Sequence, residues 1–119
     1  MTTREMVVLT DVKLITCIVQ RDAADAIIQA ARAAGAQGAT VNYARGMGVR
    51  ERLGILGFAV NVQKEVINVL VSSEQVERVF ESMYLAGNLD IPGAGIMYVT
   101  EVEKAATFVP EGVREKLAV

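Results

Sequence analysis

Residues 14–19 read LITCIV, and residues 66–71 read VINVLV. Both runs are rich in β-branched residues, and each is followed by an amphipathic stretch that ends at a glycine. The two copies are about 52 positions apart, so one pattern is written twice in the chain. Each copy reads as a strand, a helix and a second strand, and the sequence therefore predicts two βαβ units.

The helices of these units are expected over residues 23–34 and 75–86, and the strands that follow them over residues 38–43 and 95–102. Apolar side chains recur at helical spacing on one side of each helix, and we expect them in the core: Ala24, Ile27, Ile28 and Ala31, then Val76, Val79, Phe80 and Met83. Candidate N-caps are Asp22, Ser72 and Ser73, and candidate left-handed C-caps are Gly35 and Gly87.

Two such units pair into one four-stranded antiparallel sheet with both helices on one face, so the predicted fold class is α+β, ferredoxin-like (βαβ–βαβ). The chain offers no third helix of adequate length for the other face, so a second copy is its natural cover. The composition agrees, because 52% of the 119 residues are apolar and the mean hydropathy is +0.34. A small domain buries its apolar surplus most easily between subunits.

Charge and residue content exclude several classes of function. Twelve basic and 14 acidic residues give a net charge of −2, which argues against a nucleic-acid binder. The absence of histidine removes the commonest general base and the commonest transition-metal ligand, so we expect neither catalysis nor a metal site. The single cysteine, Cys17, lies inside an apolar run and is expected to be a buried hydrophobe.

The apolar runs also bear on localisation. The longest one is far shorter than the roughly 18 residues of a membrane-spanning helix. The first 13 residues mix charged and apolar side chains and lack the apolar core of a signal peptide. We therefore expect a cytoplasmic protein without direct membrane insertion.

The segment between the two units combines glycines with basic side chains. Residues 44–65 read ARGMGVRERLGILGFAVNVQKE, with arginines at positions 45, 50 and 52. Free backbone N–H groups beside guanidinium groups suit an anionic ligand such as a phosphate, but a flexible, solvated hairpin explains the same residues equally well. The second arm, residues 53–62, is apolar and indicates an interaction surface. A loop of this length in so small a domain is usually functional.

A second glycine cluster, residues 91–95, reads IPGAG and lies between the second helix and the last strand. Its simplest interpretation is a turn. Two glycine-rich segments that approach each other across a subunit boundary would instead form a nucleotide site without metal or histidine.

Several segments, in this order, resemble the PII signal-transduction superfamily. They are KLITCIV (13–19), AGAQGATVNYARGMG (34–48), Lys64, VLVSSEQVERVFESM (69–83) and PGAGIMYV (92–99). The resemblance implies a single domain over residues 1–119, with a core at 12–110, a T-loop-like segment at 44–64 and a C-terminal tail at 110–119.

The resemblance also implies a homotrimer with ligand clefts between subunits. An adenine nucleotide (AMP, ADP, ATP or a cyclic relative) would act there as an effector, with no obligatory cofactor and no metal. The implied nucleotide-binding residues are Gly38, Ala39, Thr40, Arg45, Gly46, Met47, Gly48, Arg50, Lys64, Gly93, Ala94 and Gly95. The loop would regulate a partner, such as a membrane transporter, through Arg50, Arg52, Leu53, Ile55, Leu56 and Phe58.

The chain departs from the family pattern at several positions. Its T-loop is shorter and has no Ser, Thr or Tyr between Arg45 and Gln63, so no loop hydroxyl is available for modification. Arg50 stands where nitrogen-sensing members have a glutamine. Ile96, Thr107 and Val109 stand where basic phosphate ligands are usual, which should weaken triphosphate binding.

Two further hypotheses stand beside this non-enzymatic sensor. The alternative function is a nucleotide-independent interaction module that docks through its apolar loop arm. A small ferredoxin-like enzyme or metal-binding trimer is the third hypothesis, which the lack of histidine and of clustered carboxylates disfavours.

Overall fold

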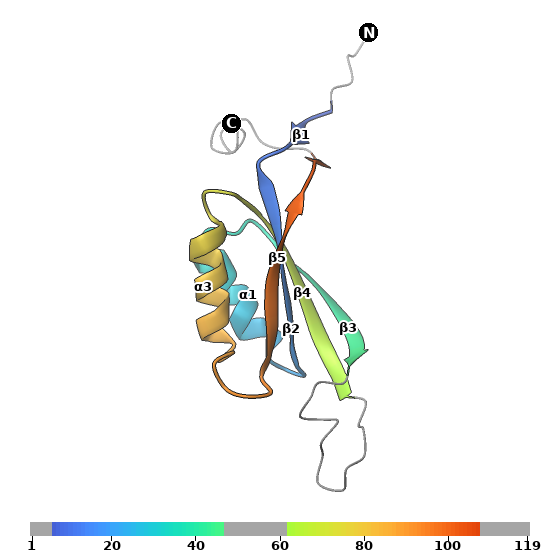
Figure 1. The fold of residues 1–119 in the computed structure, drawn as a ribbon, viewed down its shortest axis with the longest axis vertical. Coiled ribbons are helices and arrows are strands. Elements are labelled where there is room, and N and C mark those ends of the chain that lie inside the picture. The colour runs from blue at the N-terminus through green and yellow to red at the C-terminus, as the bar shows by residue number, and fades with distance from the viewer. Residues whose placement is uncertain (1–5, 47–61, 108–119) are drawn as a thin grey trace, which may run out of the picture.

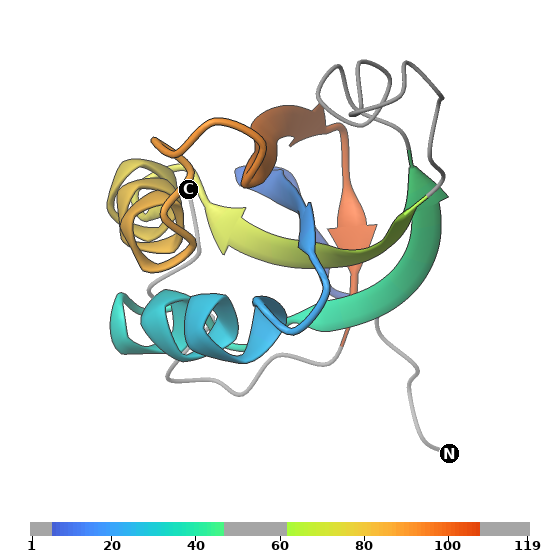
Figure 2. The same cartoon turned by 90° about the horizontal axis from the view of Figure 1, so that it is seen from below.

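The computed structural model describes residues 6–46 and 62–107. The elements in chain order are β1 (Val8–Leu9), β2 (Val12–Gln20), α1 (Ala24–Ala33), β3 (Thr40–Gly46), β4 (Val62–Ser72), α3 (Val76–Ala86), β5 (Gly95–Val102) and β6 (Ala105–Ala106). Strands β2 to β5 form one antiparallel sheet in the order β3-β4-β2-β5, and both helices lie against the same face (Figure 1, Figure 2). The α+β, ferredoxin-like prediction is confirmed.

The strand register decides which side chains face the helices. Cys17 of β2 lies opposite Ile67 of β4 and Met97 of β5, and successive residues of a strand point to opposite faces. The fully buried side chains include Ile15, Cys17, Val19, Ile67 and Val69 from the sheet and Ile27, Val79 and Met83 from the helices. They form one core, which confirms most of the predicted helical stripes; Ile28 and Phe80 are only partly buried at its margin.

The opposite face of the sheet, which we call the open face, has no described helix against it (Figure 1). By register, its side chains come from Leu14, Thr16 and Ile18 of β2, Val66, Asn68 and Leu70 of β4, and Ile96, Tyr98 and Thr100 of β5. Leu70, Ile96 and Tyr98 are exposed at 39%, 58% and 43%. Large apolar side chains at this exposure on a flat sheet indicate a surface that another molecule covers.

Both helices end in a Schellman motif, a pair of backbone hydrogen bonds around a left-handed residue. In α1 the N–H of Ala36 donates to Ala31 O and that of Gly35 to Arg32 O, with Gly35 at φ 118° as expected. In α3 the left-handed residue is Asn88 (φ 53°), whereas Gly87 remains helical. The helix therefore ends at Gly87 as predicted, but the left-handed residue lies one position later than predicted.

The predicted N-caps are also wrong. Asp22 lies in the turn before α1 with φ 72°, and the N-cap residues of the two helices are Ala23 and Gln75, not Ser72 or Ser73. For α1, the carboxylate of Glu65 on β4 accepts a hydrogen bond from the N–H of Ala24 at 3.1 Å. A side chain from a distant strand thus replaces the local cap and adds negative charge at the positive end of the helix.

The C-terminal end of α1 is held by the start of α3. Arg78 Nε donates to the carbonyl oxygen of Ala34 at 2.7 Å, and Gln75 Nε2 donates to that of Gly35 at 3.3 Å. The positive guanidinium group also suits the negative end of the helix dipole. These bonds fix the two helices against each other over the sheet.

Strands β3 and β4 run further than expected. Pairing between them continues through Arg45–Gln63 to Gly46–Val62, so both ends of the predicted loop segment 44–64 form a two-stranded ribbon. The start of β3 lies two residues later than predicted, at Thr40.

Candidate functional site

The glycine cluster after α3 is a tight turn. The N–H of Ala94 donates to the carbonyl oxygen of Ile91 at 3.0 Å, Pro92 occupies the second position, and Gly93 occupies the third with φ 83°. Proline followed by a glycine of positive φ is typical of a type II turn. The sequence therefore predicts this turn correctly, for a clear conformational reason.

Gly95 allows the backbone after the turn to lie against the end of β2, because it has no side chain. A Cβ atom at this position would fall on the carbonyl oxygen of Ile18 and would lie 3.0 Å from a methyl group of Val19. Only glycine allows β5 to begin this close to its neighbour, so Gly95 has a structural role whatever else it does.

Lys64 lies at the same end of the sheet as this turn. It pairs with Gln20 across β2 and β4, two positions from Val66 of the open face, and its exposed fraction is 9%. Since β4 and β5 are both neighbours of β2, Lys64 and the start of β5 lie about 10 Å apart across the sheet. The structure thus brings Lys64 and the turn to one end of the molecule.

Residues 38–40 lie away from Lys64 and the glycine turn within the same chain. Thr40 pairs with Asn68, four positions along β4 from Lys64, or about 13 Å. Strands β3 and β5 are opposite edges of the sheet, so Gly38, Ala39 and Thr40 do not meet Gly93–Gly95 within one subunit. Nothing lies within 4 Å of a Cβ built on Gly38, so packing does not require a glycine there.

Arg45 points away from Lys64. By the β3–β4 register, Tyr43 and Arg45 share the helix-covered side of the sheet with Glu65, whereas Ala44 shares the open face with Lys64. An open hollow of about 600 Å³ is lined here by Tyr43, Ala44, Arg45 and Gln63. The arginine and lysine predicted for one ligand site therefore belong to two faces of the loop's base.

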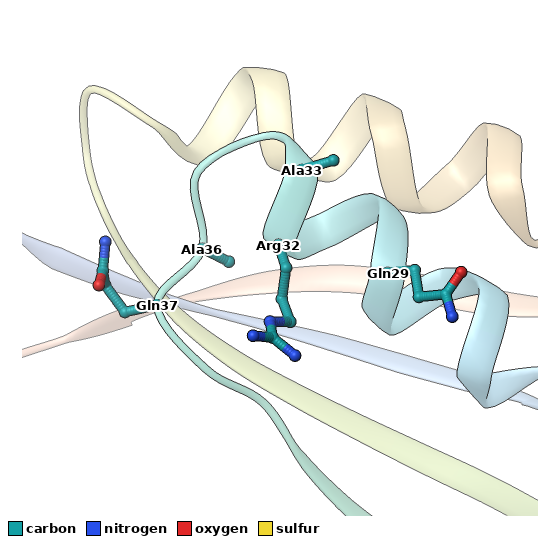
Figure 3. Close-up of a pocket in the computed structure, with 5 residues that line it drawn as sticks. All are labelled: Gln29, Arg32, Ala33, Ala36 and Gln37. Carbon is teal, nitrogen blue, oxygen red and sulfur yellow. The ribbon is translucent and has the colours of Figure 1, made fainter.

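A second hollow, of about 500 Å³, lies beside the end of α1 and is lined by Gln29, Arg32, Ala33, Ala36 and Gln37 (Figure 3). In Figure 3 the side chains of Gln29 and Gln37 diverge from that of Arg32 rather than converging on one point. Arg32 stands in the last turn of the helix, where the dipole already favours a cation. This arrangement explains Arg32 without a ligand.

Two polar residues near the site were not predicted. Gln20 donates a hydrogen bond from Nε2 to the carbonyl oxygen of Gly93 at 2.8 Å. Thr16 Oγ1 donates to Asn68 Oδ1 at 2.9 Å on the open face, beside Thr40. Thr16 and Asn68 interrupt apolar strands, and this interruption is the sequence signal that points to them; Gln20, at the end of its strand, gives no such signal.

Burial raises the pKa of the Cys17 thiol to about 11, so the group stays protonated at neutral pH, as a structural thiol should. Within residues 6–46 and 62–107, no group of three or more carboxylate, cysteine or histidine side chains is placed to bind a metal ion. In the same ranges no helix is long and apolar enough to cross a membrane.

The remaining predicted site residues lie outside the described ranges: Met47, Gly48, Arg50, Arg52, Leu53, Ile55, Leu56 and Phe58.

The fold and this geometry define a class: a small ferredoxin-like protein with a glycine turn and a buried lysine at one end of its sheet. The family model described as "Nitrogen regulatory protein P-II" matches residues 12–111. The chain therefore belongs to this family of signal-transduction proteins, which are regulatory proteins, typically trimers, that bind effectors and control partners.

A solved structure agrees with this membership. The crystal structure of Arabidopsis thaliana PII bound to citrate superposes with a TM-score of 0.64 at 22% sequence identity, covering 79% of each chain. At this identity the likeness shows the fold. A comparison with curated protein sequences gave no match.

Proposed function

We propose that this chain is a trimeric PII-family sensor that binds an adenine nucleotide in clefts between its subunits. Ligand binding changes the fit of the loop at residues 44–64 to a regulated partner, such as a membrane transporter. The observation that supports this most is the placement of Lys64 and the type II turn at one end of the sheet, on either side of Gln20.

The distance between residues 38–40 and residues 93–95 within one chain favours a ligand cleft that two copies form together. Residues 38–40 lie too far from residues 93–95 for a single small ligand to contact both in one subunit. The open face, with Leu70, Ile96 and Tyr98 exposed, offers the apolar contact that such an assembly needs. A neighbouring copy would therefore both cover the open face and complete the site.

The charges favour a ligand with few phosphate groups. Lys64 supplies a cation near the turn, whereas Ile96, the residue after Gly95, is apolar and 58% exposed. Each charge-assisted contact that is missing should cost about 1.5–3 kcal/mol of binding free energy. We therefore expect ADP or AMP to bind at least as tightly as ATP.

Isothermal titration against ATP, ADP, AMP, cyclic AMP and citrate tests the proposal; citrate is included because the Arabidopsis protein binds it. We expect micromolar binding of one or more adenine nucleotides and a loss of about 10-fold or more in Lys64→Gln. The exposed Lys104→Gln is the matched control, with unchanged affinity.

Two results would contradict the proposal: no adenine nucleotide binding below about millimolar concentration, or equal affinities in wild type and Lys64→Gln. A charged residue at Gly95 is a poor probe, because its side chain would collide with β2 before any ligand is considered. Partner capture that ignores added nucleotide would instead support the nucleotide-independent interaction module.

A further inference from the structure

We infer that Gln20 is a positioning residue, which holds the turn at residues 91–94 in the orientation that accepts an anion. The anionic ligand in this inference rests on the proposed function, whereas the hold on the turn stands on the geometry alone. None of the sequence patterns or comparisons assigns Gln20 a role.

The position of Gln20 in the sheet suits this role. It is the last residue of β2, and it lies between the two segments that the proposed site needs. Its backbone pairs with Lys64 on β4, while its side-chain amide donates to the carbonyl oxygen of Gly93 at 2.8 Å. One residue thus connects the return of the loop with the glycine turn.

The peptide group that Gln20 contacts belongs to the turn itself. The peptide between Gly93 and Ala94 is held at both ends, because its carbonyl oxygen accepts from Gln20 and its N–H donates to Ile91 at 3.0 Å. Without Gln20, the bond to Ile91 would be the one hydrogen bond left on this peptide among residues 6–46 and 62–107. Glycine at the third position gives the turn conformational freedom that a second bond removes.

The hydrogen bond from Gln20 also affects the charge that a bound anion would meet. A carbonyl oxygen that faces a phosphate repels it, whereas backbone N–H groups attract it. By donating to the Gly93 oxygen, the Gln20 amide offsets the partial negative charge of that oxygen and holds the turn in one orientation. Such preorganisation improves affinity because the ordering is already present in the free protein.

The variant that tests this inference is Gln20→Met, which keeps the length of the side chain and removes its donor. Gln29→Met, at an exposed position on α1, is the matched control for the same chemical change. Gln20→Glu is less suitable, since it would also add a negative charge next to Lys64.

The first measurement needs no ligand. We expect amide hydrogen exchange of Ala94, followed by NMR, to be about 5-fold faster in Gln20→Met, the size expected for the loss of one neutral hydrogen bond. Gln29→Met should show the wild-type rate. Unchanged exchange of Ala94 in Gln20→Met would overturn the inference whether or not any nucleotide binds.

The second measurement separates positioning from general damage. Affinity for ADP should fall by about 5-fold in Gln20→Met, whereas affinity for adenosine, which has no phosphate, should stay the same. Equal losses for both ligands would overturn the role in anion binding. If Ala94 exchange accelerates but the wild type binds no nucleotide, the hold on the turn is supported and the proposed function fails.

Discussion

The two faces of the sheet use the same strands for different purposes. Ile15, Cys17, Val19, Ile67 and Val69 face the helices and are at most 1% exposed. One position along the chain, the open face alternates apolar residues with Thr16, Asn68 and Lys64. Only one of these faces is closed within the described part of the chain (Figure 2).

The two faces therefore differ in role: the helix-covered face stabilises the subunit, and the open face is the one expected to contact other subunits. The helix-covered face is a close-packed core, where burial of apolar surface stabilises the subunit. The open face carries exposed apolar side chains with polar groups between them, the composition of a surface that binds other molecules. A substitution on the first face should therefore act within the subunit, and one on the second should act between subunits.

The largest effect is expected from Ile67→Ala, which removes a fully buried side chain. It should lower the free energy of unfolding by about 3 kcal/mol, by lost burial and a residual cavity. Leu70→Ala, on the same strand but the open face, is the comparison. In urea denaturation the effect of Leu70→Ala should depend on protein concentration and that of Ile67→Ala should not. Equal behaviour of the two variants would remove the distinction between the faces.

A smaller loss is expected from Gly95→Ala, because the new methyl group would collide with the Ile18 carbonyl. The expected cost is about 2 kcal/mol, typical of forced overpacking. Gly38→Ala is the matched control, since open space surrounds that position, and should change stability by less than about 0.5 kcal/mol. Thermal unfolding of both variants measures this; a tolerated Gly95→Ala would show that the turn is not pressed against β2.

The smallest expected effect is the pH dependence due to Cys17. Its thiol has a pKa of about 11 in the folded chain, above that of an exposed thiol, so stability is complete at neutral pH and falls as pH rises between the two values. At pH 10 the expected loss is about 1 kcal/mol. Unfolding of wild type and Cys17→Ala at pH 7 and pH 10 measures it; identical pH slopes would contradict the burial of this thiol.

The sequence predicts the sheet and helices well because their apolar periods are local and strong. The predictions of the helix caps failed for a different reason. Glu65 reaches the start of α1 from β4, and Asn88 takes the left-handed position one residue beyond Gly87. The Glu65 contact is tertiary, so no local pattern indicates it. The bonds around Asn88 are local to the end of α3, and asparagine tolerates the left-handed region, so two adjacent residues were able to take that position.

The candidate site likewise has some features that the local sequence encodes and others that depend on residues far apart in the chain. Pro92 and Gly93 encode their turn directly, and the register of β4 places Lys64 at the same end of the sheet. Gln20 carries no comparable signal, since its partner Gly93 is 73 positions away in the chain. The separation of Arg45 from Lys64 onto opposite faces also depends on how far the β3–β4 ribbon extends, which the glycine-rich composition of the loop hides.

The central claim is that a second copy covers the open face and completes the ligand site. Light scattering during size-exclusion chromatography tests it most directly, on wild type, Leu70→Glu on the open face and Leu85→Glu on the outer side of α3, a position that is 61% exposed. We expect three times the 12.8 kDa chain mass for wild type and Leu85→Glu, and a smaller species that has lost nucleotide binding for Leu70→Glu. A monomeric wild type, or a Leu70→Glu variant with unchanged mass and affinity, would contradict it.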